Sequence, residues 1–345
     1  MAMHTVEERG LSFKVARYLI SLGDKVLSDV HVEGAERLRE VKAHDKKAIF
    51  LYASLHKSLW ETTGIPSAIY SAGLPVPYPC MGDNLVKGKI AQKIARRLGL
   101  FIIPKFNDNN HFASTKNLIL GMQEHFDKGK DILIFPETSR KGIVRNGVHG
   151  QFFPACFLTA LNYQAKSLSD GRQASNPYDI HIVPVNVDYS KVKDANDLLR
   201  SVSRSKTMKF HDLFKTVFKT IGDVYISFGE PIRAGELEGM KKKELAALVR
   251  DECLDLVKIL PINVAAEGLL RSPSGAYSQV LKSIAEARDL LLFKSRNFRG
   301  FTIKTEPDEI YRLGKGEKLM KDIGLTKLYA SYIRHYLPTT SFSRP

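Results

Sequence analysis

The chain has 345 residues, enough for one large α/β domain with appendages or for two modest domains. Apolar residues make up 43% of it and charged residues 26%, a balance that excludes a largely disordered, collagen-like or coiled-coil protein. Lysines and arginines outnumber acidic residues by 52 to 37, a net charge of +15, so the preferred partner should be anionic: nucleic acid, an anionic membrane surface, or a phosphorylated or CoA-type substrate.

Cysteine usage and hydropathy indicate in which cellular compartment the protein works. Cys80, Cys156 and Cys253 are far apart and form no CxxC pair, so we expect no disulfide framework, no zinc site and a reducing cytosolic environment. The first 15 residues lack the apolar core of a secretory signal. No stretch reaches the roughly 18 apolar residues that a membrane-spanning helix needs, so any membrane contact should be peripheral.

The first predicted element is an amphipathic helix over residues 10–28, with apolar residues at three- and four-residue spacing. Its apolar stripe fits packing on the protein's own core. It also fits a membrane surface, because Lys14, Arg17 and Lys25 flank the stripe.

From residue 48, short apolar runs alternate with helical stretches, which predicts an α/β domain with a layered, mostly parallel central sheet flanked by helices. The three helices predicted between these strands end at glycines, Gly73, Gly99 and Gly129, and Ser114 is the predicted N-cap of the third. The predicted strands cover residues 48–54, 100–106, 131–137, 180–189 and 223–232, and the predicted helices cover 61–73, 88–99 and 114–129.

The predicted domain organisation has three parts. Residues 1–30 hold the N-terminal amphipathic helix, and residues 31–235 form the α/β domain. After residue 235 the strand signals end, so residues 236–345 are predicted to be a helical C-terminal region.

A histidine and a carboxylate follow the first buried strand. His56 precedes Glu61 by five residues, at the point where the predicted strand passes into a helix. A carboxylate can hydrogen-bond one ring nitrogen and fix the tautomer, so that the other nitrogen takes a proton from a hydroxyl. The spacing alone is weak, because it also arises by chance.

Further charged residues follow other predicted strands. Lys105 ends the run GLFIIPK, and Glu137, Ser139 and Arg140 lie in FPETSRKG. In parallel α/β sheets, ligands bind at the carboxyl edge of the strands, so these side chains are expected near His56. Two proline-containing blocks, IVPV over 182–185 and FGEPI over 228–232, follow in the same order along the chain.

In this order the blocks resemble the glycerolipid acyltransferase superfamily, whose signatures are HxxxxD, a GxxFIxR-like block, FPEGTR and an apolar block around a proline. The resemblance covers about residues 30–235. The runs ARRLGLFIIPKF and IVPVNVDYSKV are closest to the branch that acylates glycerol 3-phosphate and dihydroxyacetone phosphate. The chain departs from the family pattern at Glu61, Lys105 and Thr138, which replace Asp, Arg and Gly.

The resemblance implies roles for the dyad and for the cationic residues. His56 would be the general base that deprotonates the acceptor hydroxyl as it attacks an acyl thioester, and Glu61 would orient it. The extra methylene of Glu61 requires the helix or the His56 rotamer to adjust. Lys105 and Arg140 would hold the acceptor phosphate, although lysine lacks the bidentate fork of arginine.

Other residues of the same blocks have less defined roles. Glu137 would contact the hydroxyls of the acceptor or hold Arg140. Ser139 is a further substrate-binding candidate. Lys57 is either an additional phosphate or CoA contact or simply solvated, and Trp60 is expected to pack in the core.

The resemblance implies no metal and no cofactor. The expected donor is acyl-CoA or acyl carrier protein, and the expected acceptor is glycerol 3-phosphate or a related phosphorylated molecule, in phospholipid synthesis. The expected location is the cytoplasmic face of an anionic membrane, as a peripheral protein.

Two alternatives remain. A catalytically weakened family member would bind lipid or a membrane surface without chemistry, a possibility raised by Glu61 and Thr138. A nucleic-acid-binding protein would explain the net charge and the basic stretch 200–219, but the sequence has no recognised module or aromatic platform, so nucleic acid is not expected as a partner.

Overall fold

The computed structural model describes residues 30–58, 60–83, 99–103, 111–137, 149–169, 178–192, 222–272, 276–295, 306–316 and 323–337, with a few single residues between them. The amphipathic helix predicted over residues 10–28 lies outside this part of the chain, as does most of the helix predicted over 88–99.

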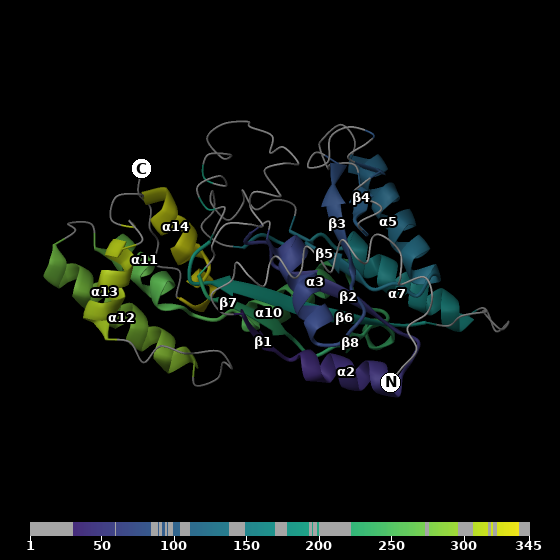
Figure 1. Cartoon of the computed structure of the whole chain (residues 1–345), viewed down its shortest axis with the longest axis horizontal. Helices are drawn as coiled ribbons and strands as arrows, with labels where there is room; N and C mark the ends of the chain where they lie inside the picture. Colours follow the sequence, from purple (N-terminus) through teal and green to yellow (C-terminus); the bar gives the residue numbers. More distant parts are fainter. Residues whose placement is uncertain are drawn as a thin grey trace.

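A twisted sheet runs through the centre of the molecule (Figure 1). Within the described residues its strand order is β1–β7–β6–β2–β5–β3–β4, and β8 pairs with β6. The pairs are parallel except for β6–β7 and β6–β8, so the mostly parallel sheet is confirmed. The strands are β1 (Val30–Glu33), β2 (Ala48–Ser54), β3 (Tyr78–Gly82), β4 (Phe101–Ile103), β5 (Ile132–Ile134), β6 (Asp179–Tyr189), β7 (Val224–Phe228) and β8 (Ile232–Arg233).

The strand predicted over residues 223–232 is divided into β7 and β8. The break falls at Gly229, whose N–H donates to the carbonyl of Pro184, and at Pro231, which has no N–H for a ladder. β1 and β3 escaped prediction, because each is short and has partly exposed residues without the apolar run of a buried strand.

β6 extends beyond its parallel neighbour β2, and this difference in length shapes the site. The last residue of β2, Ser54, pairs with Val185, whereas β6 continues to Tyr189. Beyond Val185, β6 is held on its other side by antiparallel pairing with β7. Residues 186–189 therefore lie beside the loop that follows β2, with Asn186 and Asp188 on one face of the strand and Tyr189 on the other.

Helices surround the sheet. α5 and α7 lie side by side near β4, and α10 packs against β6 and β2 (Figure 1). The later helices α11 to α14 pack on one another at the opposite end of the molecule. The helices are α2 (Ala35–His44), α3 (Glu61–Ser71), α5 (His111–Asp127), α7 (Ala155–Ser169), α10 (Lys242–Asp255), α11 (Pro261–Arg271), α12 (Tyr277–Ser295), α13 (Pro307–Gly316) and α14 (Ile323–Ser331), with short 3₁₀ turns η3 (Ala234–Leu237) and η5 (Arg334–Tyr336).

The predicted helix ends are partly correct. Gly73 and Gly129 follow α3 and α5 with positive φ angles of 78° and 65°, a conformation that glycine adopts without a steric penalty. The N-cap prediction for Ser114 is wrong: α5 begins at His111, and Ser114 is buried inside it. Among the described helices, none combines the length and the apolar character needed to cross a bilayer.

Candidate active site

The site begins where β2 ends. All seven residues of β2 are buried, because the strand lies in the middle of the sheet with both faces covered. The chain then leaves the sheet through residues 55–58 and enters α3 at Glu61. The N–H of Leu55 still reaches the carbonyl of Val185 at 3.4 Å, so the loop starts in a position set by β6.

His56 and Glu61 form the predicted pair. The His56 Nδ1 lies 2.9 Å from Glu61 Oε2, with the carboxylate fully buried and 16% of the histidine side chain exposed. A buried carboxylate at Nδ1 requires the proton on that nitrogen, which leaves Nε2 as the basic nitrogen of the neutral ring. The ring of Phe135 packs against the imidazole with centroids 4.4 Å apart. The longer Glu61 thus reaches His56.

Glu61 also closes the loop on which His56 lies. Its carboxylate accepts the backbone N–H of Lys57 at 3.0 Å and of Ser58 at 2.8 Å. The Tyr189 hydroxyl donates to Oε1 at 3.2 Å from the end of β6. Trp60 is buried beside Tyr189, in an edge-to-face contact, which confirms its core role. One carboxylate therefore fixes both the ring and the backbone around it.

Glu137, which follows β5, holds the same loop. Its Oε2 accepts the backbone N–H of His56 at 3.0 Å, and its Oε1 accepts His149 Nδ1 and the Gly150 N–H, each at 3.0 Å. Burial raises the pKa of Glu137, but His149 and these hydrogen bonds outweigh it and lower the pKa below the usual glutamate value. Bracing the His56 backbone is thus added to the two roles predicted for Glu137.

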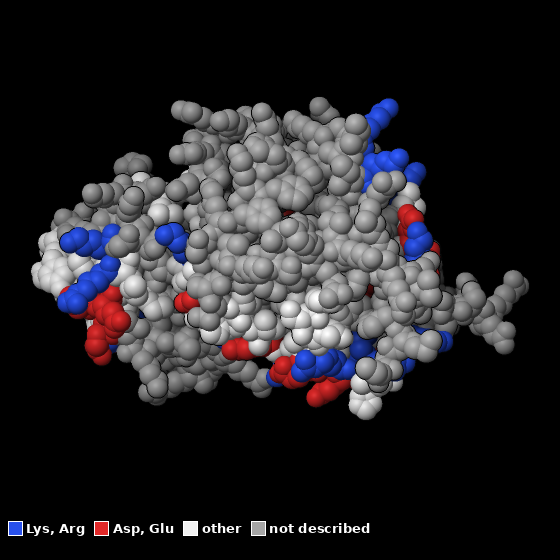
Figure 2. Space-filling model, viewed as in Figure 1, with Lys and Arg blue, Asp and Glu red and all other residues white. Residues whose placement is uncertain are grey.

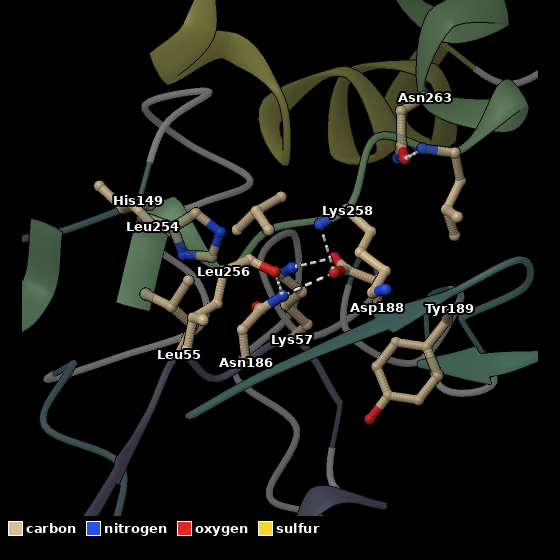
Figure 3. A network of polar contacts seen from close by, with 12 residues as sticks. Leu55, Lys57, His149, Asn186, Asp188, Tyr189, Leu254, Leu256, Lys258 and Asn263 are labelled. Carbon is tan, nitrogen blue, oxygen red and sulfur yellow. Dashed lines mark hydrogen bonds and ion pairs between the residues drawn. The ribbon is translucent and has the colours of Figure 1, made fainter. Parts of the chain in front are cut away.

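The structure corrects the prediction for Lys57. Its side chain is 1% exposed, and its ammonium lies 2.5 Å from Asp188 Oδ1 on β6, so it is neither solvated nor open to a phosphate. Asp188 Oδ2 accepts the Asn186 side-chain amide at 2.6 Å and the Lys258 N–H at 2.7 Å (Figure 3). The reason is the length of β6, which places Asp188 beside the loop after β2. Lys57 is an anchor for that loop.

The remaining predicted site residues fall outside the described part of the chain. Lys105, Ser139 and Arg140 follow β4 and β5, but their side chains are not described.

Sequence reasoning missed Asp188, Tyr189 and His149. Asp188 carried a signal, because a carboxylate inside the apolar run IVPVNVDY must find a cationic or hydrogen-bonded partner if the strand is buried. Tyr189 and His149 carried none.

A cluster with metal-ligand chemistry lies away from this site. Asp45, Asp179 and His181 gather near the amino ends of β2 and β6, whereas His56 follows the carboxyl end of β2. Asp179 is also ion-paired with Arg233 at 2.7 Å. This cluster has no part in the geometry of the His56 pair.

Comparison with known proteins identifies the fold around this pair. The acyltransferase family model matches residues 29–188, the segment that holds β1 to β6 with His56, Glu61 and Glu137. In this segment the chain is similar to the acyltransferase family.

Relatives extend the comparison. A glycerol-3-phosphate acyltransferase of Alteromonas mediterranea is 27% identical over 220 residues, and one of Shewanella sp. (strain ANA-3) is 26% identical over 220 residues. Each alignment covers 63% of this chain and 25% of the relative, so the chain matches about a quarter of the length of these proteins.

A solved structure is also similar to this chain over part of its length. It is the 1-acyl-sn-glycerophosphate acyltransferase PlsC of Thermotoga maritima, with a TM-score of 0.42 and 16% identity over 72% of this chain and 80% of that one.

Proposed function

We propose that the protein transfers a fatty acyl group from a thioester to a hydroxyl of glycerol 3-phosphate or a related phosphorylated acceptor, with His56 as general base. The observation that carries the proposal is the His56–Glu61 pair, which lies at the carboxyl end of a central parallel strand, with its proton-accepting nitrogen set by a buried carboxylate.

His56 both accepts and returns the proton in the proposed reaction. His56 Nε2 takes the proton of the acceptor hydroxyl while the oxygen attacks the thioester carbonyl, forming the C–O bond. The C–S bond then breaks, and the imidazolium returns the proton to the departing thiolate. Glu61 remains ionised and stabilises the imidazolium, as in other His–carboxylate pairs. General-base catalysis of this kind contributes about 10²–10⁴-fold to the rate.

The acceptor phosphate is assigned to Lys105 and Arg140, and Ser139 is a further candidate for binding the acceptor. These residues follow β4 and β5 in the sequence, and both strands run parallel to β2, so their carboxyl ends lie at the same edge of the sheet as the end of β2. Further support comes from the glycerol-3-phosphate acyltransferases among the relatives. Charge-assisted hydrogen bonds of this type contribute about 1.5–3 kcal/mol each. The donor is acyl-CoA or acyl carrier protein, and neither a metal nor a cofactor enters the step.

We further propose that the protein works in phospholipid synthesis at the cytoplasmic, anionic surface of a membrane. The support is the net charge of +15. Described basic and acidic residues lie side by side along the lower edge in Figure 2, where Figure 1 places α2, so this edge is not uniformly cationic. Binding to anionic vesicles that is released by salt is the expected behaviour, and equal binding to neutral vesicles would contradict it.

The central test is thiol release from palmitoyl-CoA with and without glycerol 3-phosphate, comparing wild type with His56→Ala. Release that depends on the acceptor and vanishes in the variant is expected. The rival function, lipid binding without chemistry, retains the Thr138 departure in its favour. It predicts no thiol release with any phosphorylated or lysolipid acceptor, with acyl carrier protein also tried as donor, while lysolipid binding persists.

A further inference from the structure

Three tyrosines of the C-terminal region reach back to the α/β domain. Tyr329, Tyr332 and Tyr336 lie in or just after α14, and all three are buried. The Tyr329 hydroxyl accepts the N–H of Val192, just after β6, and the Tyr336 hydroxyl donates to the carbonyl of Leu254 at the end of α10. The C-terminal segment 323–337 is therefore fastened to the part of the fold that surrounds the His56 loop.

Tyr332 contacts Lys57 and His149, one next to His56 in the chain and the other bound to Glu137. Its ring lies under the Lys57 ammonium, 5.2 Å from Nζ to the ring centroid, a cation–π distance. The other contact is His149, whose ring stacks on Tyr332 with centroids 6.0 Å apart and an interplanar angle of 26°. Lys57 is the residue next to His56, and His149 holds Glu137, which binds the His56 N–H.

These contacts form two short paths from one ring to one loop. On the first path, Tyr332 confines the Lys57 side chain, whose other partner is Asp188. On the second, Tyr332 confines His149 and so the Glu137 carboxylate. Both His149 and Glu137 have side chains only 2% exposed, so no solvent layer separates the ring from the loop along this path.

We propose that Tyr332 is a positioning residue, which keeps the His56 loop in its catalytic geometry by confining Lys57 and His149 from the C-terminal segment. The inference rests on the proposed acyl transfer for its kinetic consequence. It gives the C-terminal region a function, since the acyltransferase match ends at residue 188 and does not include it. Catalytic geometry tolerates little displacement, and a shift of about 1 Å costs up to about 10²-fold in rate.

The test compares three variants by kcat, KM and thermal unfolding. Tyr332→Leu removes the ring, and we expect kcat per folded molecule to fall about 10- to 100-fold with KM for donor and acceptor within about twofold. Tyr332→Phe keeps the ring and is expected to restore most of kcat. Tyr329→Phe is the matched control: it removes one hydrogen bond from the same segment, so we expect lower stability with unchanged kcat.

A second readout does not depend on activity. Hydrogen exchange at the His56 and Lys57 amides, which donate to Glu137 and Glu61, should be faster in Tyr332→Leu and unchanged in Tyr332→Phe. If wild type releases no thiol with any acceptor, the proposed function fails, and this exchange measurement still decides whether Tyr332 holds the loop.

Either of two results would overturn the proposal that Tyr332 positions the His56 loop. Wild-type kcat and wild-type exchange at these amides in Tyr332→Leu would overturn the proposal, as would an equal loss of kcat in Tyr329→Phe. If Tyr332→Leu does not fold, Lys57→Met combined with Asp188→Asn removes the anchor without leaving a buried charge unpaired. A folded double variant with wild-type kcat and wild-type exchange at the His56 and Lys57 amides would overturn the part of the proposal that runs through Lys57.

Discussion

Replacing Glu61 by glutamine tests how one carboxylate serves both the ring and the loop. Oε2 accepts from His56 Nδ1, and Oε1 accepts from the Ser58 N–H and the Tyr189 hydroxyl. The Lys57 N–H is shared by both oxygens, at 3.0 Å from Oε1 and 3.1 Å from Oε2. Glutamine keeps one acceptor oxygen and places an NH₂ group at the other position. With full burial of the side chain, water cannot supply the missing acceptor.

Either orientation of the amide has a cost. If the NH₂ faces His56, it donates to Nδ1 and shifts the ring proton to Nε2, which removes the base. A histidine held in the wrong tautomer in such a pair lowers kcat by up to about 10⁴-fold. If the NH₂ faces Ser58, a buried backbone N–H loses its acceptor, which costs about 1–3 kcal/mol.

We therefore expect Glu61→Gln to lower kcat by at least about 10²-fold, to leave KM nearly unchanged, and to lower the free energy of unfolding by about 1–3 kcal/mol. Thiol release measures the first two, and denaturant unfolding measures the third. Glu61→Asp is the matched variant, which keeps the charge but has a side chain one methylene shorter. Its kcat should lie between those of wild type and Glu61→Gln. A Glu61→Gln enzyme with kcat within about threefold of wild type would refute the reasoning.

Three further predictions concern the support of the site. Glu137→Gln should lower stability above about pH 5 and lose this effect at lower pH. The pKa of Glu137 is lowered in the folded protein, so the charged carboxylate stabilises the fold above the unfolded glutamate pKa near 4.3, and this stabilisation is lost as pH falls through the folded pKa. Thermal unfolding of both proteins against pH checks this, and a constant stability difference at all pH values would contradict it. Gly64→Ala should lower the free energy of unfolding by about 1–3 kcal/mol, because a Cβ there would lie 2.0 Å from the buried Trp60 ring. The fluorescence of the single tryptophan reports unfolding, and an unfolding midpoint equal to or above that of wild type would count against the packing argument. Tyr189→Phe removes one donor to Glu61 without changing ring packing, so kcat should fall about threefold to tenfold with little change in stability; an unchanged kcat would show that the 3.2 Å contact is dispensable.

The lysine after the proposed base shows why neighbours in sequence need not share a function. His56 and Lys57 are adjacent, but one remains partly exposed and the other is buried against Asp188, 131 residues further along the chain. Replacing an ion pair of this kind by neutral groups is often tolerated, whereas breaking it leaves a buried charge. The pair therefore specifies where the loop lies.

The sequence by itself determined the local pattern and the chemistry. Buried strands were visible as apolar runs, and β2 has the predicted bounds because a central strand needs apolar residues on both faces. The dyad was visible as well, since His56 and Glu61 are close in sequence and the strand-to-helix junction brings them together. Short edge strands and helices such as β1 and α2 were missed, because their partly exposed residues form no buried apolar run.

Only the tertiary structure decided which groups hold the dyad in place. Glu137 was expected near His56 from the carboxyl edge of the sheet, but its bond to the His56 N–H was not. Asp188 and Tyr189 reach the loop because β6 extends beyond β2, a matter of strand register that no local pattern encodes. Tyr332 arrives from a helix far along the chain, as one of 13 tyrosines in the sequence. Contacts between residues so far apart in the sequence depend on how the helices and strands pack. From the sequence alone, a tyrosine such as Tyr332 could as well lie on the surface as against the His56 loop.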